Sequence, residues 1–267
     1  MSSRRYDDQQ IQRFVDDFHR DSFCILPAHI SNDKMSRWKQ TFEPLLHDHI
    51  AAQGNLQNRG ANRYYVTLPF AHPFADPDIY DNDDVLAIVE KLVGKDFRMV
   101  QLATDTPTRG SDYQELHRDA PPLFPEWDRE TPSFQLAVNF PLVDVTDENG
   151  PFEVVRGTHV LSKAEALRRL ESGEAKLEPV KLKLGDVMIR DVRHLHRGTP
   201  NRTDEPRPMV VIGYSRKWLH RPEVNIRVPR AAIASMSERA RHMLRGNPVV
   251  ESLDAPEEVE VYQSFAF

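Results

Sequence analysis

Two pairs of histidine and aspartate have the spacing of metal ligands, because the tripeptide His-Arg-Asp occurs at His19 to Asp21 and again at His117 to Asp119. In an extended chain, side chains two positions apart point to the same face, so such a pair can bind one divalent ion. With 11 His and 41 acidic residues among 267, a match is also expected by chance. The surroundings of each copy must therefore decide which one does chemistry.

The first copy lies at the end of a predicted helix over residues 7–21. Its apolar residues Ile11, Phe14, Val15 and Phe18 have the spacing of one helix face. Polar residues after that face belong at the surface, so we interpret this copy as structural. The second copy lies between a predicted strand and the loop at Pro121 and Pro122. An extended backbone there allows both side chains to reach one ion.

A third ligand is expected at His196, in the segment DVRHLHRGTPNRTDEPRPMVV. His194 competes with it, because both histidines share a face of an extended segment. Two imidazoles and one carboxylate leave three coordination positions open on one side of the ion, as in non-haem Fe(II) oxygenases. Arg207 follows His196 by eleven positions and precedes another predicted strand.

Three segments resemble the phytanoyl-CoA hydroxylase family of Fe(II)/2-oxoglutarate dioxygenases. They are QELHRD, DVTDENGPFEVVRGTH and GDVMIRDVRHLHRGTPNRTDEPR. The third segment is the most specific, and it is what favours His196 over His194. The resemblance extends from the first predicted helix to the helix after Trp218.

The resemblance implies a role for five residues. His117, Asp119 and His196 would bind Fe(II). Arg207 would bind the far carboxylate of 2-oxoglutarate, and Gln114 would contact the end of this cosubstrate nearer the metal. A guanidinium offers paired donors that match a carboxylate, so lysine would be a poorer residue at this position. The implied reaction consumes O2 and 2-oxoglutarate, with hydroxylation of a C–H bond as the default outcome.

The chain departs from the family pattern at Gly198, where many members have a serine that also contacts the cosubstrate. Thr199, Thr203 or no residue could take that role. Related halogenases have a small residue in place of the carboxylate ligand, whereas this chain has Asp119. Halogenation is therefore disfavoured.

Composition and charge exclude several classes of protein. The net charge of −6 with interspersed signs predicts no nucleic-acid partner. The longest apolar runs are far shorter than the ~20 residues that cross a bilayer, so no membrane span is expected. A single cysteine, Cys24, and a polar start without a secretory signal favour a soluble protein of the cytoplasm.

The predicted fold is mainly β with flanking helices, in one dioxygenase domain over residues 1–267. Residues 1–95 alternate helix and strand, and residues 96–218 hold short strands separated by turn signals, typical of a sandwich or jelly roll. The resemblance implies a double-stranded β-helix, a jelly roll of the cupin type. Residues 219–267 form a last helix, RAAIASMSERARHMLRG, and a tail.

The substrate is expected to be a small organic metabolite of a biosynthetic pathway. An apolar pocket wall is predicted from residues of two segments: Leu123, Phe124 and Trp127, with Tyr64 and Tyr65. Arg118 and Arg193 are expected to be solvated at the surface, or else to recognise an anionic group of the substrate.

Two other protein classes share parts of these motifs with an oxygenase. A non-oxidative jelly-roll metal-binding protein would use the same three ligands but would have no need of Arg207. A protein kinase is excluded, because Phe124 stands where the kinase loop that begins His-Arg-Asp needs Asn, and no glycine-rich phosphate loop is found.

Overall fold

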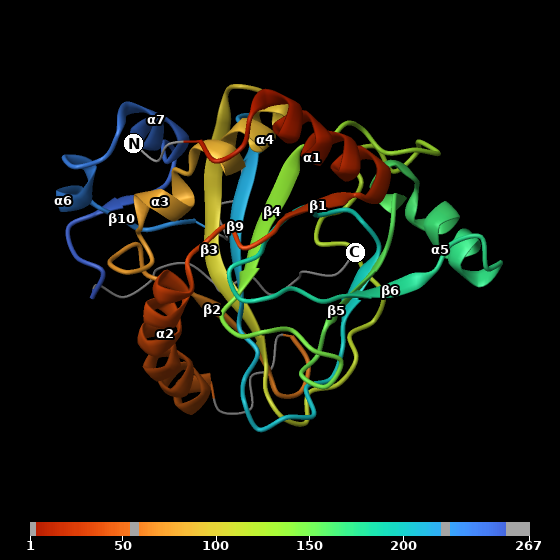
Figure 1. Cartoon of the computed structure of the whole chain (residues 1–267), viewed down its shortest axis with the longest axis horizontal. Helices are drawn as coiled ribbons and strands as arrows, with labels where there is room; N and C mark the ends of the chain where they lie inside the picture. The colour runs from red at the N-terminus through yellow and green to blue at the C-terminus, as the bar shows by residue number, and fades with distance from the viewer. Residues whose placement is uncertain (1–3, 54–58, 220–224, 255–267) are drawn as a thin grey trace.

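The computed structural model describes residues 4–53, 59–219 and 225–254 (Figure 1). The helices are α1 (Asp8–Asp21), α2 (Asn32–Gln53), α3 (Pro77–Tyr80), α4 (Asp83–Val93), the 3-10 helix η1 (Thr158–Val160), α5 (Lys163–Glu171), α6 (Arg230–Ile233) and α7 (Glu238–Met243). The strands are β1 (Phe23–Leu26), β2 (Arg63–Thr67), β3 (Phe97–Pro107), β4 (Gln135–Pro141), β5 (Phe152–Val155), β6 (Leu177–Val180), β7 (Val187–Asp191), β8 (His196–Gly198), β9 (Met209–Arg216), β10 (Val228–Pro229) and β11 (Val249–Val250).

Most strands belong to two antiparallel sheets. Six strands pair in the order β1-β7-β4-β9-β3-β2, and three pair in the order β6-β5-β8. In addition, β10 and β11 form a short parallel pair. Figure 1 shows α1 and α4 close together at one side of the larger sheet, and α5 beyond the end of β6. This arrangement confirms the prediction of a mainly β protein with flanking helices.

The larger sheet has one apolar face and one mixed face, because side chains alternate along each strand. On β4, Leu136, Val138 and Phe140 belong to the main hydrophobic core. The residues between them, such as Ala137 and Asn139, line a cavity on the other side. The same alternation on the neighbouring strands therefore builds a packed face and a cavity face from a single sheet.

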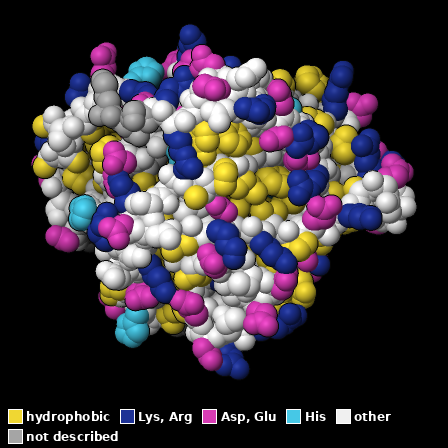
Figure 2. All heavy atoms as spheres, viewed as in Figure 1, with side chains coloured by type: hydrophobic (Ala, Val, Ile, Leu, Met, Phe, Trp, Pro, Cys, Tyr) yellow, Lys and Arg dark blue, Asp and Glu magenta, His cyan; other side chains and the backbone are white. Residues whose placement is uncertain are grey.

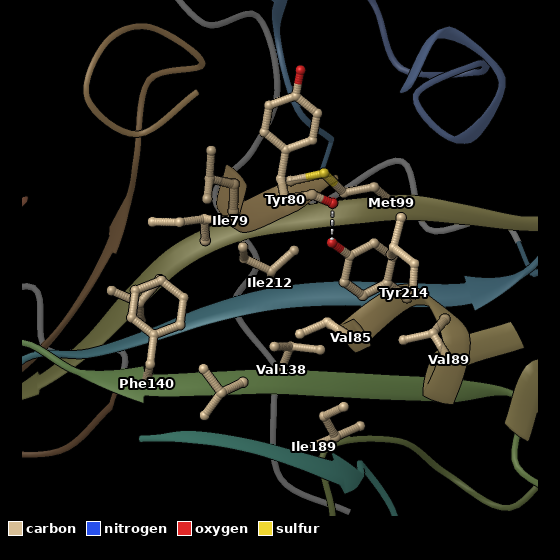
Figure 3. Close-up of a cluster of buried hydrophobic side chains, with 14 of the residues drawn as sticks. Ile79, Tyr80, Val85, Val89, Met99, Val138, Phe140, Ile189, Ile212 and Tyr214 are labelled. Atoms are coloured by element: carbon tan, nitrogen blue, oxygen red, sulfur yellow. Dashed lines mark hydrogen bonds between the residues drawn. The ribbon is translucent and has the colours of Figure 1, made fainter. Parts of the chain in front are cut away.

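The packed face is covered by α3 and α4. Figure 3 shows Ile79, Val85 and Val89 of these helices against Ile212 and other apolar side chains of the strands. The hydroxyl of Tyr214 is buried in this core and donates to the carbonyl of Tyr80 at 2.7 Å, so the polar end of its ring has a partner.

Local sequence signals mark where the helices begin and end. Asp7 and Gln10 form a reciprocal capping box at the start of α1. Asn82 accepts from two backbone amides of the first turn of α4. Gly94, with φ of +90°, follows Val93 and ends α4, because a positive φ favours glycine.

The single helix predicted after Trp218 is wrong, because two short helices occupy its residues. Ser237 ends the continuous pattern by accepting a hydrogen bond from the backbone of Ala240, which starts α7 as a separate helix. The apolar side chains of this segment nevertheless pack into the protein, since Met236, Ala240 and Met243 are buried in the main core.

Charged side chains of both signs share the surface. On the face shown in Figure 2, Lys and Arg lie among Asp and Glu rather than in a patch of one sign. Within residues 4–53, 59–219 and 225–254, no helix combines the length and the apolar character needed to span a membrane.

Candidate active site

His117 and His196 lie side by side because their backbones pair. The amide of His117 donates to the carbonyl of His196 at 2.9 Å, and the amide of His196 donates back at 3.1 Å. The amide of Asp119 donates to the carbonyl of Val192, just after β7, at 2.9 Å. The second His-Arg-Asp copy is thereby held against the segment that carries His196, as predicted.

The three predicted ligand residues present donor atoms within 4.8 Å of one another. Oδ1 of Asp119 lies 3.6 Å from Nε2 of His117 and 3.4 Å from Nε2 of His196. Each Nδ1 contacts a backbone carbonyl, of Glu115 at 2.8 Å and of His194 at 2.9 Å. Because a carbonyl only accepts, each Nδ1 carries the proton and each Nε2 keeps the lone pair that a metal requires.

The protonation states of this group suit a divalent cation. Burial acts to raise the pKa of the Asp119 carboxyl, but the Arg190 guanidinium and the two imidazoles hold it well below its ordinary value. Burial lowers the pKa of His196 to about 4. At neutral pH the site therefore offers an ionised carboxylate and a neutral His196 imidazole, which fits the ligand set of ferrous iron.

The competing histidines lie outside this group. His194 is buried, and its Nδ1 is 3.2 Å from the hydroxyl of Ser22. In the first His-Arg-Asp copy, His19 is exposed and Asp21 forms an ion pair with Arg156 at 3.3 Å. The structural interpretation of the first copy is thus confirmed.

Arg207 is a buried cation on the same cavity as the three ligands. Its exposure is 2%, and its Nε has no hydrogen-bond partner among the described residues. The nearby carboxylate of Asp105 pairs with Arg63 at 2.7 Å. Burial and the Arg63 guanidinium lower the pKa of Arg207 to about 10, against the effect of Asp105. A guanidinium in this condition favours an anionic ligand, so the site fits the far carboxylate of 2-oxoglutarate.

Gln114 also lines the cavity and is held against the strand of His196. Its side-chain oxygen accepts from the backbone amide of Gly198 at 2.9 Å, and its backbone amide donates to the Gly198 carbonyl at 3.0 Å. The acceptor side of the carboxamide is therefore engaged, which leaves its NH2 group as the side that a cosubstrate could contact.

The departure at Gly198 has a steric cause. A Cβ at this position would lie 2.5 Å from Nη2 of Arg63. Arg63 is 2% exposed and is fixed by Asp105 and by the carbonyl of Thr199, the latter at 2.9 Å. The Arg63 guanidinium therefore takes the space of a family serine.

Thr199 and Thr203 do not replace that serine. The Thr199 hydroxyl donates to the carbonyl of Pro151 at 2.8 Å, and the Thr203 hydroxyl donates to the side chain of Asn201 at 2.8 Å. Neither threonine lines the cavity. Of the possibilities left open at this position, the structure supports the one in which no threonine takes the role.

The expectation that Arg118 and Arg193 are solvated or bind substrate is wrong. Both are almost fully buried, and both pair with Glu130, at 2.6 Å and 3.3 Å. Arg193 also pairs with the buried Asp191 at 2.8 Å. Arg118 stands between His117 and Asp119, so alternation turns it away from the ligands and into this ionic network.

The predicted pocket wall is mostly wrong, since Tyr65 lines the cavity but the other four residues do not. Phe124 and Trp127 are 43% and 49% exposed and stack on each other, with ring centroids 4.5 Å apart. Tyr64 packs against the main core instead. Adjacent residues of β2 face opposite sides, so Tyr64 and Tyr65 cannot share a wall.

The cavity contains functional candidates that the sequence motifs did not indicate. Arg190 is the most notable, because it contacts Asp119. The other polar side chains among the lining residues are Arg59, Gln101, Asp105, Gln135 and Asn139. Strand alternation could have located Arg190: with Val187 and Ile189 on the core face, Met188 and Arg190 must face the other way.

The sequence matches the phytanoyl-CoA dioxygenase (PhyH) family over residues 18–209, a segment that contains every residue of the predicted site. The chain belongs to this family. It is therefore an Fe(II)/2-oxoglutarate-dependent dioxygenase family enzyme, and the predicted Fe(II), 2-oxoglutarate and O2 are confirmed as its cofactor and cosubstrates.

Similar proteins include dioxygenase olcK of Penicillium canescens, 25% identical over 244 residues that cover 85% of this chain and 77% of that protein. The crystal structure of the epimerase SnoN with Fe3+, alpha-ketoglutarate and nogalamycin RO is 22% identical, with a TM-score of 0.60, over 79% of this chain and 85% of that one. HygX from Streptomyces hygroscopicus, solved with nickel, 2-oxoglutarate and hygromycin B, is 20% identical, with a TM-score of 0.59, over 80% and 89%. These structures confirm the predicted double-stranded β-helix fold.

Proposed function

We propose that this dioxygenase hydroxylates a C–H bond of a small organic metabolite, and that His117, Asp119 and His196 bind its iron. The family supports the class of reaction. The observation that carries the assignment of the site is Arg207, a buried guanidinium whose Nε has no hydrogen-bond partner among the described residues, on the cavity that also holds the three ligands. A cavity with these two features is suited to a dicarboxylate that bridges them.

The residues of the chain bind and orient the reactants. Arg207 fixes the far carboxylate of 2-oxoglutarate, and Gln114 donates to an oxygen at the end near the metal. Fe(II) and 2-oxoglutarate, when bound, supply with O2 the oxidant that attacks the C–H bond. The apolar lining at Tyr65, Val192 and Val211 excludes water from the substrate side of the cavity.

The proposed substrate is a natural-product intermediate. SnoN and HygX, which share the fold, were solved with nogalamycin RO and with hygromycin B. In this chain, hydroxylation is the proposed outcome, and desaturation, epoxidation and ring formation are alternatives that would use the same oxidant. A metal protein without oxygenase activity, the alternative from the sequence, accounts for the three ligands but not for Arg207.

A matched pair of variants tests this proposal, because the chain carries the tripeptide His-Arg-Asp twice. Succinate released from 2-oxoglutarate is measured with Fe(II), O2 and a panel of natural-product intermediates. The proposal expects Asp119→Ala to abolish succinate release and Asp21→Ala, at the surface copy, to retain the wild-type rate. Full turnover by Asp119→Ala would refute the assignment of this residue.

A further inference from the structure

The two oxygens of Asp119 have different surroundings. Oδ1 faces Nε2 of both histidines, at 3.6 Å from His117 and 3.4 Å from His196. Oδ2 accepts from Nη2 of Arg190 at 2.7 Å. One oxygen therefore points toward the metal position and the other is held by a cation.

Arg190 is itself fixed in place. Its side chain is 10% exposed, and its Nε donates to Oδ1 of Asn139 at 3.0 Å. The side-chain NH2 of Asn139 in turn donates to the backbone carbonyl of Val210 at 3.0 Å. The guanidinium also lies over the ring of Phe152, 5.1 Å from its centroid. Arg190 lies on β7, and these contacts join it to β4 and β5 and, through Asn139, to β9, so the position of Arg190 is set by the sheets and not by a loop.

We propose that Arg190 is a positioning residue that restricts Asp119 to metal binding through Oδ1 alone. This inference rests on the proposed function, since it requires Asp119 to be a metal ligand. A carboxylate can bind a cation through one or both oxygens, and an ion pair at one oxygen opposes the second mode. A carboxylate that uses one position leaves more of the coordination sphere for 2-oxoglutarate and O2.

The proposal predicts that replacement of Arg190 strengthens Mn(II) binding, whereas general damage to the site would weaken it. Arg190 places a positive charge beside a cation site, which weakens metal binding, and it occupies an oxygen that could otherwise bind the metal. Replacing it by an uncharged side chain of similar length should therefore tighten Mn(II) binding. Loss of packing or order at the site would loosen Mn(II) binding instead.

The test uses Mn(II) without cosubstrate, on the full chain as wild type, Arg190→Met and Arg190→Lys. In Arg190→Met, Mn(II) affinity is expected to rise about tenfold, the equivalent of one charge-assisted contact, and both oxygens of Asp119 should bind Mn(II) in a crystal structure. Arg190→Lys keeps the charge and should stay within about threefold of wild type, well short of the tenfold step. Should the Met variant not fold, a crystal structure of Mn(II)-loaded Arg190→Lys decides: Asp119 bound through Oδ1, with Oδ2 on the lysine, supports the proposal.

Other outcomes overturn it. Weaker Mn(II) binding by Arg190→Met, unchanged binding, or an Asp119 that still uses a single oxygen in that variant would show that Arg190 does not control the carboxylate. For the Lys variant, an Asp119 that binds through Oδ1 without any contact to the lysine would show the same. If wild-type protein binds Mn(II) without Asp119, the proposed function itself fails, which separates the two conclusions.

Discussion

Replacement of Arg207 by methionine should make the protein more stable and less able to bind its cosubstrate. Burial and the Arg63 guanidinium lower the pKa of Arg207 from 12.5 to about 10. The charged form is therefore disfavoured in the folded state by about 3 kcal/mol, and this penalty is present at every pH below about 10. Methionine keeps the apolar contacts of the side chain without the charge.

The expected gain in the free energy of unfolding is up to about 3 kcal/mol, or roughly 6 to 12 °C in Tm for a chain of this size. Urea denaturation at pH 7 without metal or cosubstrate measures it. Arg202→Met, at an exposed arginine five positions earlier, is the matched control and should change stability by less than about 0.5 kcal/mol.

The same variant should lose most of its response to 2-oxoglutarate. Removal of a paired, charge-assisted contact to a carboxylate costs about 3 kcal/mol, which is roughly a hundredfold in Kd. Calorimetric titration of the Mn(II)-loaded protein measures this loss. A variant that is less stable than wild type, or that binds 2-oxoglutarate with unchanged affinity, would refute the account of Arg207 as a buried cation that binds an anionic ligand.

Three further predictions concern other residues. Gly198→Ser should lower the free energy of unfolding by about 1 to 3 kcal/mol because the added Cβ meets the Arg63 guanidinium. In the double variant with Arg63→Ala, the loss of stability should be at least about 1 kcal/mol smaller than the sum of the two single losses. Additive losses would contradict the steric explanation. Gln114→Leu should raise the KM for 2-oxoglutarate about tenfold by removal of one hydrogen bond, in steady-state succinate assays, and an unchanged KM would exclude the contact. Burial lowers the pKa of His159 from 6.5 to about 4, so the unfolded state binds a proton first as the pH falls. Between pH 6.5 and 5, the free energy of unfolding from urea denaturation should fall by about 1.6 kcal/mol more for wild type than for His159→Asn, and equal losses would argue against burial of a neutral imidazole.

The type of fold and the candidate metal site could be predicted from local patterns, together with the family resemblance that favours His196 over His194. The copy at His117 stands in an extended segment and the copy at His19 ends a helix, and this difference alone separates them. Helix caps such as Asn82 and Gly94 are also local features of the sequence.

The errors come from contacts between segments that are distant in the sequence. Arg118 and Arg193 look like surface charges until the fold brings both to Glu130, which is 63 positions from Arg193. The steric reason for Gly198 lies in Arg63, which is 135 positions earlier in the chain. Arg190 could have been placed on the cavity face by strand alternation, but its contact with Asp119 depends on how β7 lies relative to the loop that carries the ligands.

The most direct test of the proposed site is anaerobic visible absorption of metal-free protein during titration with Fe(II) and then 2-oxoglutarate. A metal-to-ligand charge-transfer band should develop only after both additions, require higher 2-oxoglutarate in Arg207→Met, and be absent in His196→Ala. Iron binding without such a band in wild-type protein would contradict the claim that the three ligands and Arg207 form one site for iron and 2-oxoglutarate.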